Sequence, residues 1–375
     1  MTQNLTEPPQ LSSSQDEMQR IRTVTQIIIA FAVALFLLVQ ARFLLISLAT
    51  AIILFSLTSD AINSIARVRL GPMRIPNWLA SIVALALISA ALLSLSAVIL
   101  SQANTVLSTT LAYTDRAPEA IAAMFTWLGP DAEQAVLGSV ATLDVAGYLR
   151  ALAGQAGNIM QGTVLVILFV GFLFAERIWF TTKLESLFGD AAKAEKVGRI
   201  ISSIIHRVNY YLFVKTLVSV VTGLMVYAVA RLFDLDLAGA LGILTFLLNY
   251  IPSIGSIVAT VLVALVAFVQ LADGPLTLAI FVIVGAIQFV NGNIIDPMLM
   301  GRALRVSSFG IIISLAFWAA VWGIPGMFLA VPIMVAMMIV CSHVPGLRPV
   351  AVLLSREGLP ETESDLDTLP DQRSR

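Results

Sequence analysis

The sequence contains few of the residues that catalysis and metal binding require. It has one cysteine, Cys341, and two histidines, His206 and His343, among 375 residues. A single cysteine excludes an internal disulfide, and so few of both residue types exclude a Cys/His metal cluster. The chain also lacks a Gly-x-x-x-x-Gly-Lys-Ser/Thr nucleotide loop and a His-Glu-x-x-His or Gly-x-Ser-x-Gly element. We therefore expect no enzyme activity, no catalytic residue, no metal and no cofactor.

Charge is scarce as well. Charged residues make up 12% of the chain and hydrophobic residues 58%, with a mean hydropathy of +0.93, whereas soluble domains carry about 25% charged residues. The net charge is −1, and without a basic stripe we expect no nucleic-acid partner. This composition predicts an all-α, polytopic integral membrane protein whose main partner is the lipid bilayer.

The alternation of polar and apolar stretches predicts five regions. Polar stretches at both ends predict disordered tails, and an acidic middle stretch is too polar for the bilayer core. The predicted regions are a disordered cytoplasmic tail (1–22), N-terminal transmembrane helices (23–100), an extracytoplasmic helical segment (101–157), a transmembrane transport region (158–355) with a cytoplasmic amphipathic helix (183–208), and a second disordered cytoplasmic tail (356–375). The basic loops at 60–75 and 183–207 orient the chain with both termini in the cytoplasm.

Two Ile-Pro-small triplets interrupt the apolar C-terminal half, Ile251-Pro252-Ser253 and Ile324-Pro325-Gly326. The apolar piece before the first, Gly239–Tyr250, forms about 18 Å of helix, which is too short to cross a bilayer core of about 30 Å. We therefore predict six spans plus two oppositely directed re-entrant hairpins related by an inverted pseudo-repeat. This topology places Arg302 and Arg305 in the cytoplasm, whereas the alternative of eight ordinary spans leaves them outside.

A polar segment, Gln288–Pro297, lies between the two triplets. Buried amides and freed backbone groups are costly in hydrocarbon, so such segments occur where protein or water surrounds them, as at transporter substrate sites. The candidate pathway residues are Asn249, Tyr250, Pro252, Ser253, Gly255, Gln288, Asn291, Asn293, Asp296, Pro297, Gly323, Pro325 and Gly326. We expect Lys215 to extend toward the cytoplasmic headgroups, and Asp296 to lie at the interface near two arginines.

Three stretches carry a resemblance to a known family. They are Gly239–Gly255 (GALGILTFLLNYIPSIG), Gln288–Gly301 (QFVNGNIIDPMLMG) and Gly323–Pro332 (GIPGMFLAVP). In order and spacing they resemble the hallmarks of the autoinducer-2 exporter (AI-2E) family of bacterial permeases. The resemblance covers residues 23–352. It departs at Ser256, where a proline is frequent, and at Asn291, where an acidic residue is frequent.

The resemblance implies a multi-pass protein of the bacterial inner membrane that exports a small polar signalling molecule and assembles as a homo-oligomer, a pentamer in this family. Some members are described as Na⁺(Li⁺)/H⁺ antiporters, which is the alternative function. Proton coupling usually needs a titratable group within the membrane, and Asp296 is the one candidate. A non-transporting membrane scaffold is the alternative of another class, but a scaffold gains nothing from broken spans.

The hairpin topology can be tested by cysteine accessibility. In a Cys341→Ser background, a single cysteine introduced by Arg305→Cys should react with a membrane-impermeant thiol reagent only from the cytoplasmic side, because the hairpin topology keeps the following loop inside. Labelling from the periplasmic side alone would support eight ordinary spans instead.

Overall fold

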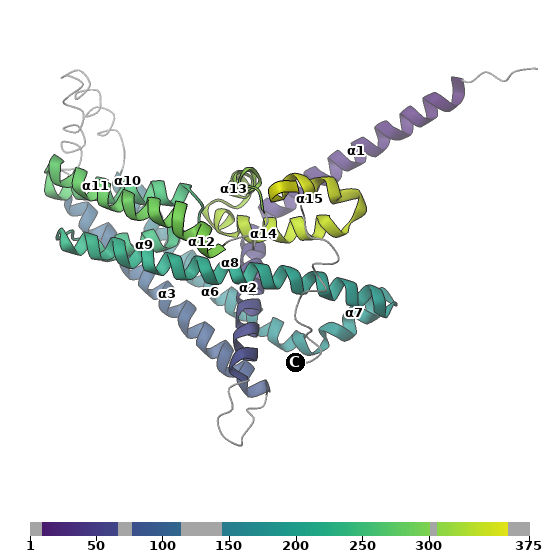
Figure 1. The fold of residues 1–375 in the computed structure, drawn as a ribbon, viewed down its shortest axis with the longest axis horizontal. Coiled ribbons are helices and arrows are strands. Elements are labelled where there is room, and N and C mark those ends of the chain that lie inside the picture. Colours follow the sequence, from purple (N-terminus) through teal and green to yellow (C-terminus); the bar gives the residue numbers. More distant parts are fainter. Residues whose placement is uncertain (1–9, 67–76, 114–144, 301–305, 359–375) are drawn as a thin grey trace, which may run out of the picture.

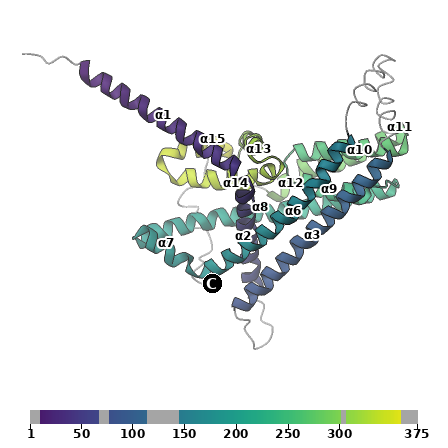
Figure 2. The ribbon, with the colours of Figure 1, turned by 180° about the vertical axis from the view of Figure 1, so that it is seen from behind.

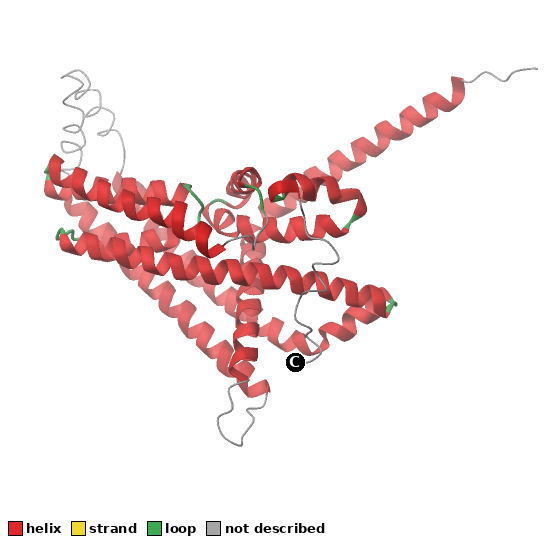
Figure 3. Ribbon diagram, viewed as in Figure 1, coloured by secondary structure: helices red, strands yellow, loops and turns green. Residues whose placement is uncertain are grey.

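The computed structural model describes residues 10–66, 77–113, 145–300 and 306–358, and nearly all of this part of the chain is helical (Figure 3). Within these ranges the only β pairing is an isolated bridge between Val306 and Ser355. Eight of the described helices are long and apolar enough to cross a membrane. The prediction of an all-α polytopic membrane protein is therefore confirmed.

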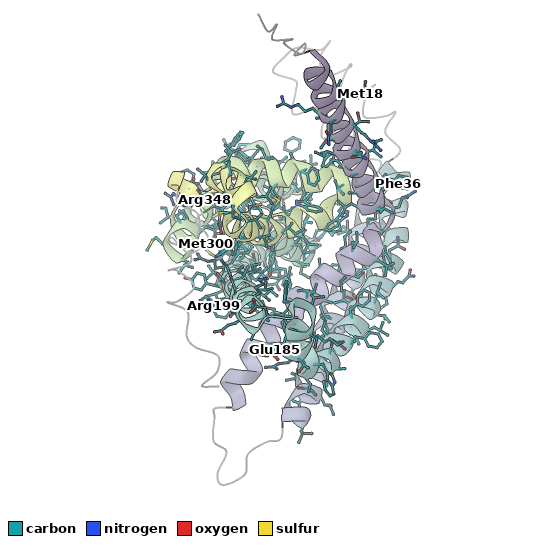
Figure 4. All side chains as sticks on the ribbon, turned by 90° about the vertical axis from the view of Figure 1, so that its right-hand side faces the viewer. Met18, Phe36, Glu185, Arg199, Met300 and Arg348 are labelled. Carbon is teal, nitrogen blue, oxygen red and sulfur yellow. The ribbon has the colours of Figure 1, made fainter. Side chains whose placement is uncertain are left out.

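The first helix, α1 (Gln10–Gln40), projects from the body of the molecule. None of its apolar stretch from Met18 to Gln40 is buried by protein, and Figure 4 shows its side chains free along the length from Met18 to Phe36. The indole Nε1 of Trp322 donates to the Leu38 carbonyl oxygen (3.0 Å) and holds the inner end. The helix begins at Gln10, inside the stretch expected to be a disordered tail, and its Gln, Glu and Arg residues are good helix formers.

Helices α2 (Arg42–Ala66), α3 (Asn77–Tyr113) and α6 (Val145–Glu176) pack together, and α3 and α6 lie side by side in Figures 1 and 2. Ala51, Val166 and Val170 form the buried centre of this group, and the hydroxyls of Ser96 and Thr163 are 2.8 Å apart between α3 and α6. Helix α3 passes the expected boundary at residue 100 without a break. Most of the expected extracytoplasmic segment, residues 114–144, lies outside the described residues.

A 42-residue helix, α8 (Ala191–Leu232), forms the axis of the C-terminal half. It follows η2 (Arg177–Trp179) and α7 (Phe180–Phe188), which ends at Gly189 with a φ of 61°. Asp190 caps α8 by accepting from the Ala192 backbone N–H (2.9 Å). The expected separate amphipathic helix 183–208 is therefore wrong: the chain breaks at Gly189, and residues 191–208 continue without interruption into the apolar half.

Helices α9 (Ala238–Leu248) and α10 (Ile254–Leu271) form the first hairpin. At its open end the Gln270 side chain accepts from the Asp236 backbone N–H (2.8 Å) and donates to the Asp234 carbonyl (2.9 Å). At its tip Ser253 adopts a φ of 62°. Gly255 lies directly against the Leu248 carbonyl, where a Cβ would overlap with the oxygen. The chain therefore doubles back at the first triplet, as predicted.

The next helix continues through the polar segment Gln288–Pro297 without a break. Helix α11 (Gly274–Val290) begins at Asp273, whose carboxylate caps the Leu276 N–H (2.9 Å). It continues through a π-helical turn, η3 (Asn291–Ile295), into α12 (Asp296–Met300). A π turn inserts a residue into a helix without ending it, and such turns are frequent at functional sites. Arg302 and Arg305 follow, outside the described residues.

Helices α13 (Ser308–Trp322) and α14 (Ile324–His343) form the second hairpin. Gly323 turns the chain with φ 67° and ψ −144°, a conformation that glycine adopts without a steric penalty. Ser314 donates across the hairpin to the Ala330 carbonyl (2.8 Å). The chain then returns through η4 (Pro345–Leu347), α15 (Arg348–Leu354) and η5 (Arg356–Gly358).

The two hairpins open in opposite directions along α8. The base of the first lies at the C-terminal end of α8, in a buried cluster that joins Val226 and Ala230 to Leu241 and Ala267. The second packs its α14 limb on the N-terminal half of α8, around Val208 and other apolar residues. Figure 1 shows α9–α11 and α14–α15 over the two halves of α8. The hairpins therefore pack on opposite halves of α8; their opposite orientation in the membrane stays a prediction.

The tight tip of the first hairpin yields a stability prediction. Gly255→Ala should lower the midpoint of thermal unfolding in detergent, because its Cβ would collide with backbone, and overpacking of this kind costs about 1–3 kcal/mol. Gly274→Ala is the matched control, since a Cβ there meets nothing within 4 Å. Equal midpoints for the two variants would show that the tip is not tightly packed.

Candidate functional site

A row of polar side chains is buried on one face of α8. Lys215, Ser219 and Thr222 are 3%, 0% and 2% exposed, and their spacing of four and three residues places them on the same face of the helix. Thr222 satisfies its hydroxyl within α8 by donating to the Val218 carbonyl (2.8 Å). Ser219 and Lys215 instead bond to other elements. This face of α8 therefore forms one side of a layer of buried polar side chains, called the polar layer below, in an otherwise apolar interior.

Two amides connect α8 to the first hairpin and to the π turn. Asn249, at the end of α9, donates its Nδ2 to Ser219 Oγ (3.0 Å), and Asn291 donates its Nδ2 to Asn249 Oδ1 (3.3 Å). Asn249 is 3% exposed and Asn291 is 4% exposed. A buried amide without a partner costs about 1–3 kcal/mol, so this chain of bonds fixes the hairpin tip against α8 and α11.

Gln288 lies one helical turn before Asn291, and its amide is not satisfied. The side chain is 4% exposed, yet neither Oε1 nor Nε2 has a hydrogen-bond partner among the described residues. Thr245, one turn before Asn249 on the parallel helix α9, likewise has a buried Oγ1 with no partner in this part of the chain. The polar layer therefore retains unused donors and acceptors beside the amide bridge.

An ion pair lies beside the amide bridge. Lys215 Nζ is 2.6 Å from Asp296 Oδ2, and the two side chains are 4% and 17% exposed. The expectation that Lys215 extends toward the headgroups is wrong, because its ammonium bonds to Asp296. Arg302 and Arg305, the expected neighbours of Asp296, lie outside the described residues. A complementary charge 81 residues away in the sequence gives the ammonium a partner inside the protein, which removes the need to reach water.

Tyr250 joins the layer to the second hairpin. Its hydroxyl is 2.7 Å from Thr216 Oγ1 on α8, and its ring stacks on Phe328 of α14 with centroids 5.7 Å apart. The adjacent Ile251 packs into a buried cluster with Leu315 and Ala330. The tip of one hairpin thus contacts the other hairpin through apolar and aromatic surfaces, and contacts α8 through hydrogen bonds.

The other predicted pathway residues lie outside this layer. Gly255 and Gly326 are buried and allow backbone contact at the hairpin tips, the second against the Trp318 carbonyl. Pro252 is half-buried at the first tip. The exposed ones are Ser253, Asn293, Pro297, Gly323 and Pro325. Of the predicted set, the structure brings together Asn249, Tyr250, Gln288, Asn291 and Asp296.

The sequence interpretation missed the α8 residues. Lys215, Thr216, Ser219 and Thr222 supply the facing side of the layer, but Lys215 was placed at the headgroups and the others were not considered. Their signal was present, since three polar residues at positions i, i+4 and i+7 of an apolar helix share one face. The local sequence pattern shows that these α8 residues share one face. Which residues they bond to depends on the tertiary fold.

The chemistry of the layer is hydrogen bonding around one neutralised charge. Within the described ranges no group of three or more His, Cys, Asp or Glu side chains could hold a metal ion. Amides and hydroxyls donate and accept with equal ease, so they suit a neutral polar solute. A layer of buried polar groups beside two broken hairpins in a polytopic helical protein is typical of membrane transporters.

The comparison with known proteins gives the family. The profile of the AI-2E family transporters matches residues 26–346, and the chain belongs to this family. The AI-2 transport protein TqsA of Escherichia coli is 34% identical over 209 residues, covering 55% of this chain and 59% of the relative. A protein of Borreliella burgdorferi, whose name marks it as a candidate transport protein, is 30% identical over 217 residues, covering 56% of this chain and 60% of its own. The matched part thus spans about three fifths of these relatives.

The amide bridge yields a second stability prediction. Asn249→Ala should destabilise the purified protein by about 1–3 kcal/mol, because it leaves the Asn291 amide buried without its acceptor. Asn293→Ala is the matched control, since Asn293 is exposed and donates only to the Phe289 carbonyl of its own helix (3.0 Å). Thermal unfolding in detergent measures both, and equal losses would contradict a structural role for the bridge.

Proposed function

We propose that this protein exports a small polar solute across the bacterial inner membrane, through a path along the layer formed by Ser219, Asn249, Gln288 and Asn291. The observation that carries the proposal is the Gln288 amide, which is buried and has no hydrogen-bond partner among the described residues. An unused buried amide is unfavourable in the resting protein and becomes favourable when a solute bonds to it. Its position next to the amide bridge gives that solute several groups to bind.

The broken hairpins support the same path. Helices α10 and α14 begin at Ile254 and Ile324, in the interior of the sequence's apolar half, and neither has a side-chain cap. Transporters place discontinuous helices of this kind around their substrates, where helix ends add partial charges. We infer that access alternates when the first hairpin moves relative to the second, because apolar and aromatic contacts such as Tyr250–Phe328 slide at lower cost than hydrogen bonds.

The solute class follows from the layer and the relatives. TqsA is named for transport of AI-2, and a small signalling molecule rich in hydrogen-bonding groups suits a layer of amides and hydroxyls. The alternative of a Na⁺(Li⁺)/H⁺ antiporter is disfavoured, because Lys215 already neutralises Asp296. A scaffold leaves the unpartnered Gln288 amide without a use.

Orientation and assembly complete the proposal. We place both termini in the cytoplasm, on the distribution of basic loops. Helix α1 contacts the rest of the protein at its inner end, but none of its apolar stretch is buried. This favours either lipid or a second copy of the chain as its cover, so we propose a homo-oligomer. We also propose that the segment 101–157 contributes to that assembly.

Flux measurements test the proposed path. Purified protein in liposomes should move AI-2, and Asn291→Leu should reduce the flux at least about tenfold, because an apolar side chain cannot replace the lost hydrogen bonds to solute. Asn293→Leu, two residues along and exposed, should keep near wild-type flux and is the matched control. Normal flux by a correctly inserted Asn291→Leu variant would place the path elsewhere.

A further inference from the structure

We propose that the ammonium of Lys215 occupies a monovalent-cation position beside Asp296, so that a built-in cation makes solute transport independent of sodium. The independence of transport from sodium rests on the proposed function. The presence of the cation position itself can be tested without any flux. It predicts that a shorter, neutral side chain at residue 215 creates a Na⁺ or Li⁺ site.

The carboxylate is only partly used by the lysine. Lys215 Nζ contacts Asp296 Oδ2 at 2.6 Å, while Oδ1 is buried and has no hydrogen-bond partner in the described part of the chain. Sodium and lithium bind oxygen ligands, and the free Oδ1 of this carboxylate is one such ligand. The position therefore has an anionic ligand, and the lysine head takes the place that a small cation would fill.

The surroundings make an unneutralised carboxylate costly. Asp296 follows directly on the π turn, where its N–H bonds to the Asn291 carbonyl. Its side chain bonds to α8, where Lys215 and Tyr211 are each 3% exposed. Taking an ion from water into such an environment costs several kcal/mol unless another charge compensates it. When Lys215 is removed, Asp296 must therefore gain a cation or a proton.

One carboxylate favours a monovalent ion. A divalent cation in an apolar interior needs further acidic ligands, and no group of three potential metal-ligating side chains occurs among the described residues. The net charge of the position is zero with a lysine, with sodium or with lithium. Substitution of Lys215 thus exchanges a covalently attached cation for a diffusible one.

Cation binding to detergent-purified full-length protein tests the inference. Thermal unfolding and ²²Na⁺ binding are measured in NaCl, LiCl and choline chloride at equal ionic strength, for the wild type, Lys215→Met, Lys215→Arg and the double variant Lys215→Met/Asp296→Asn. We expect Lys215→Met to bind at least about tenfold more sodium than the wild type, with a saturable rise in its unfolding midpoint. Lys215→Arg, which keeps the charge, and the double variant, which lacks the carboxylate, should show neither effect.

The other possible results of this experiment each support or overturn the inference. A Lys215→Met protein that folds in NaCl or LiCl but not in choline chloride would support the inference. A Lys215→Met protein that folds without gaining sodium binding would show that a proton or nothing replaces the lysine, and would overturn the inference. A Lys215→Met protein whose folding is restored only by Asp296→Asn would overturn it for the same reason. Equal sodium binding by the wild type would overturn it too. A wild-type protein that moves no solute would refute the proposed function and leave the binding result intact.

Discussion

The interior depends on one constraint: a polar group buried among apolar helices must find its partner in the protein. Lipid offers no hydrogen bonds, so an unpartnered group at that depth costs several kcal/mol. The bonds from Asn291 to Asn249 and from Asn249 to Ser219, together with the Lys215–Asp296 pair, meet this requirement. They join α8 to the first hairpin and to the π turn, so the arrangement of these elements follows from their polar side chains.

Close backbone packing makes these bonds geometrically possible. A Cβ at Gly223 of α8 would lie 2.8 Å from the Gly242 carbonyl of α9, so these two helices approach as closely as small residues allow. The same device recurs at the hairpin tips, where Gly255 and Gly326 lie against backbone carbonyls. Short side chains such as Ser219 and Asn249 can then reach each other across the helix interface.

Stability and function place opposite demands on this layer. The amide bridge and the ion pair hold the resting structure, whereas Gln288 and Thr245 remain buried with unused polar atoms within the described structure. The contact between the hairpins, through Tyr250 and Phe328, is aromatic and less directional than a hydrogen bond. The layer is therefore hydrogen-bonded on the α8 side and aromatic where the two hairpins meet.

Much of the molecule followed from sequence alone. The scarcity of charge predicted a bilayer protein, and the Ile-Pro triplets predicted where the chain doubles back, because proline and glycine act on local backbone geometry. The three motifs predicted the family, and Asn249, Gln288 and Asn291 were identified as candidates since amides are rare in apolar runs. All of these signals are contained within short segments.

Only the tertiary structure decided which polar groups meet. Lys215 was placed at the headgroups because its partner, Asp296, lies 81 residues away, and the apolar sequence around each gives no sign of the other. The π turn at Asn291–Ile295 was likewise not predicted from the sequence. Local sequence determines where a helix starts, stops and carries polar groups, whereas the pairing of those groups depends on contacts between distant segments.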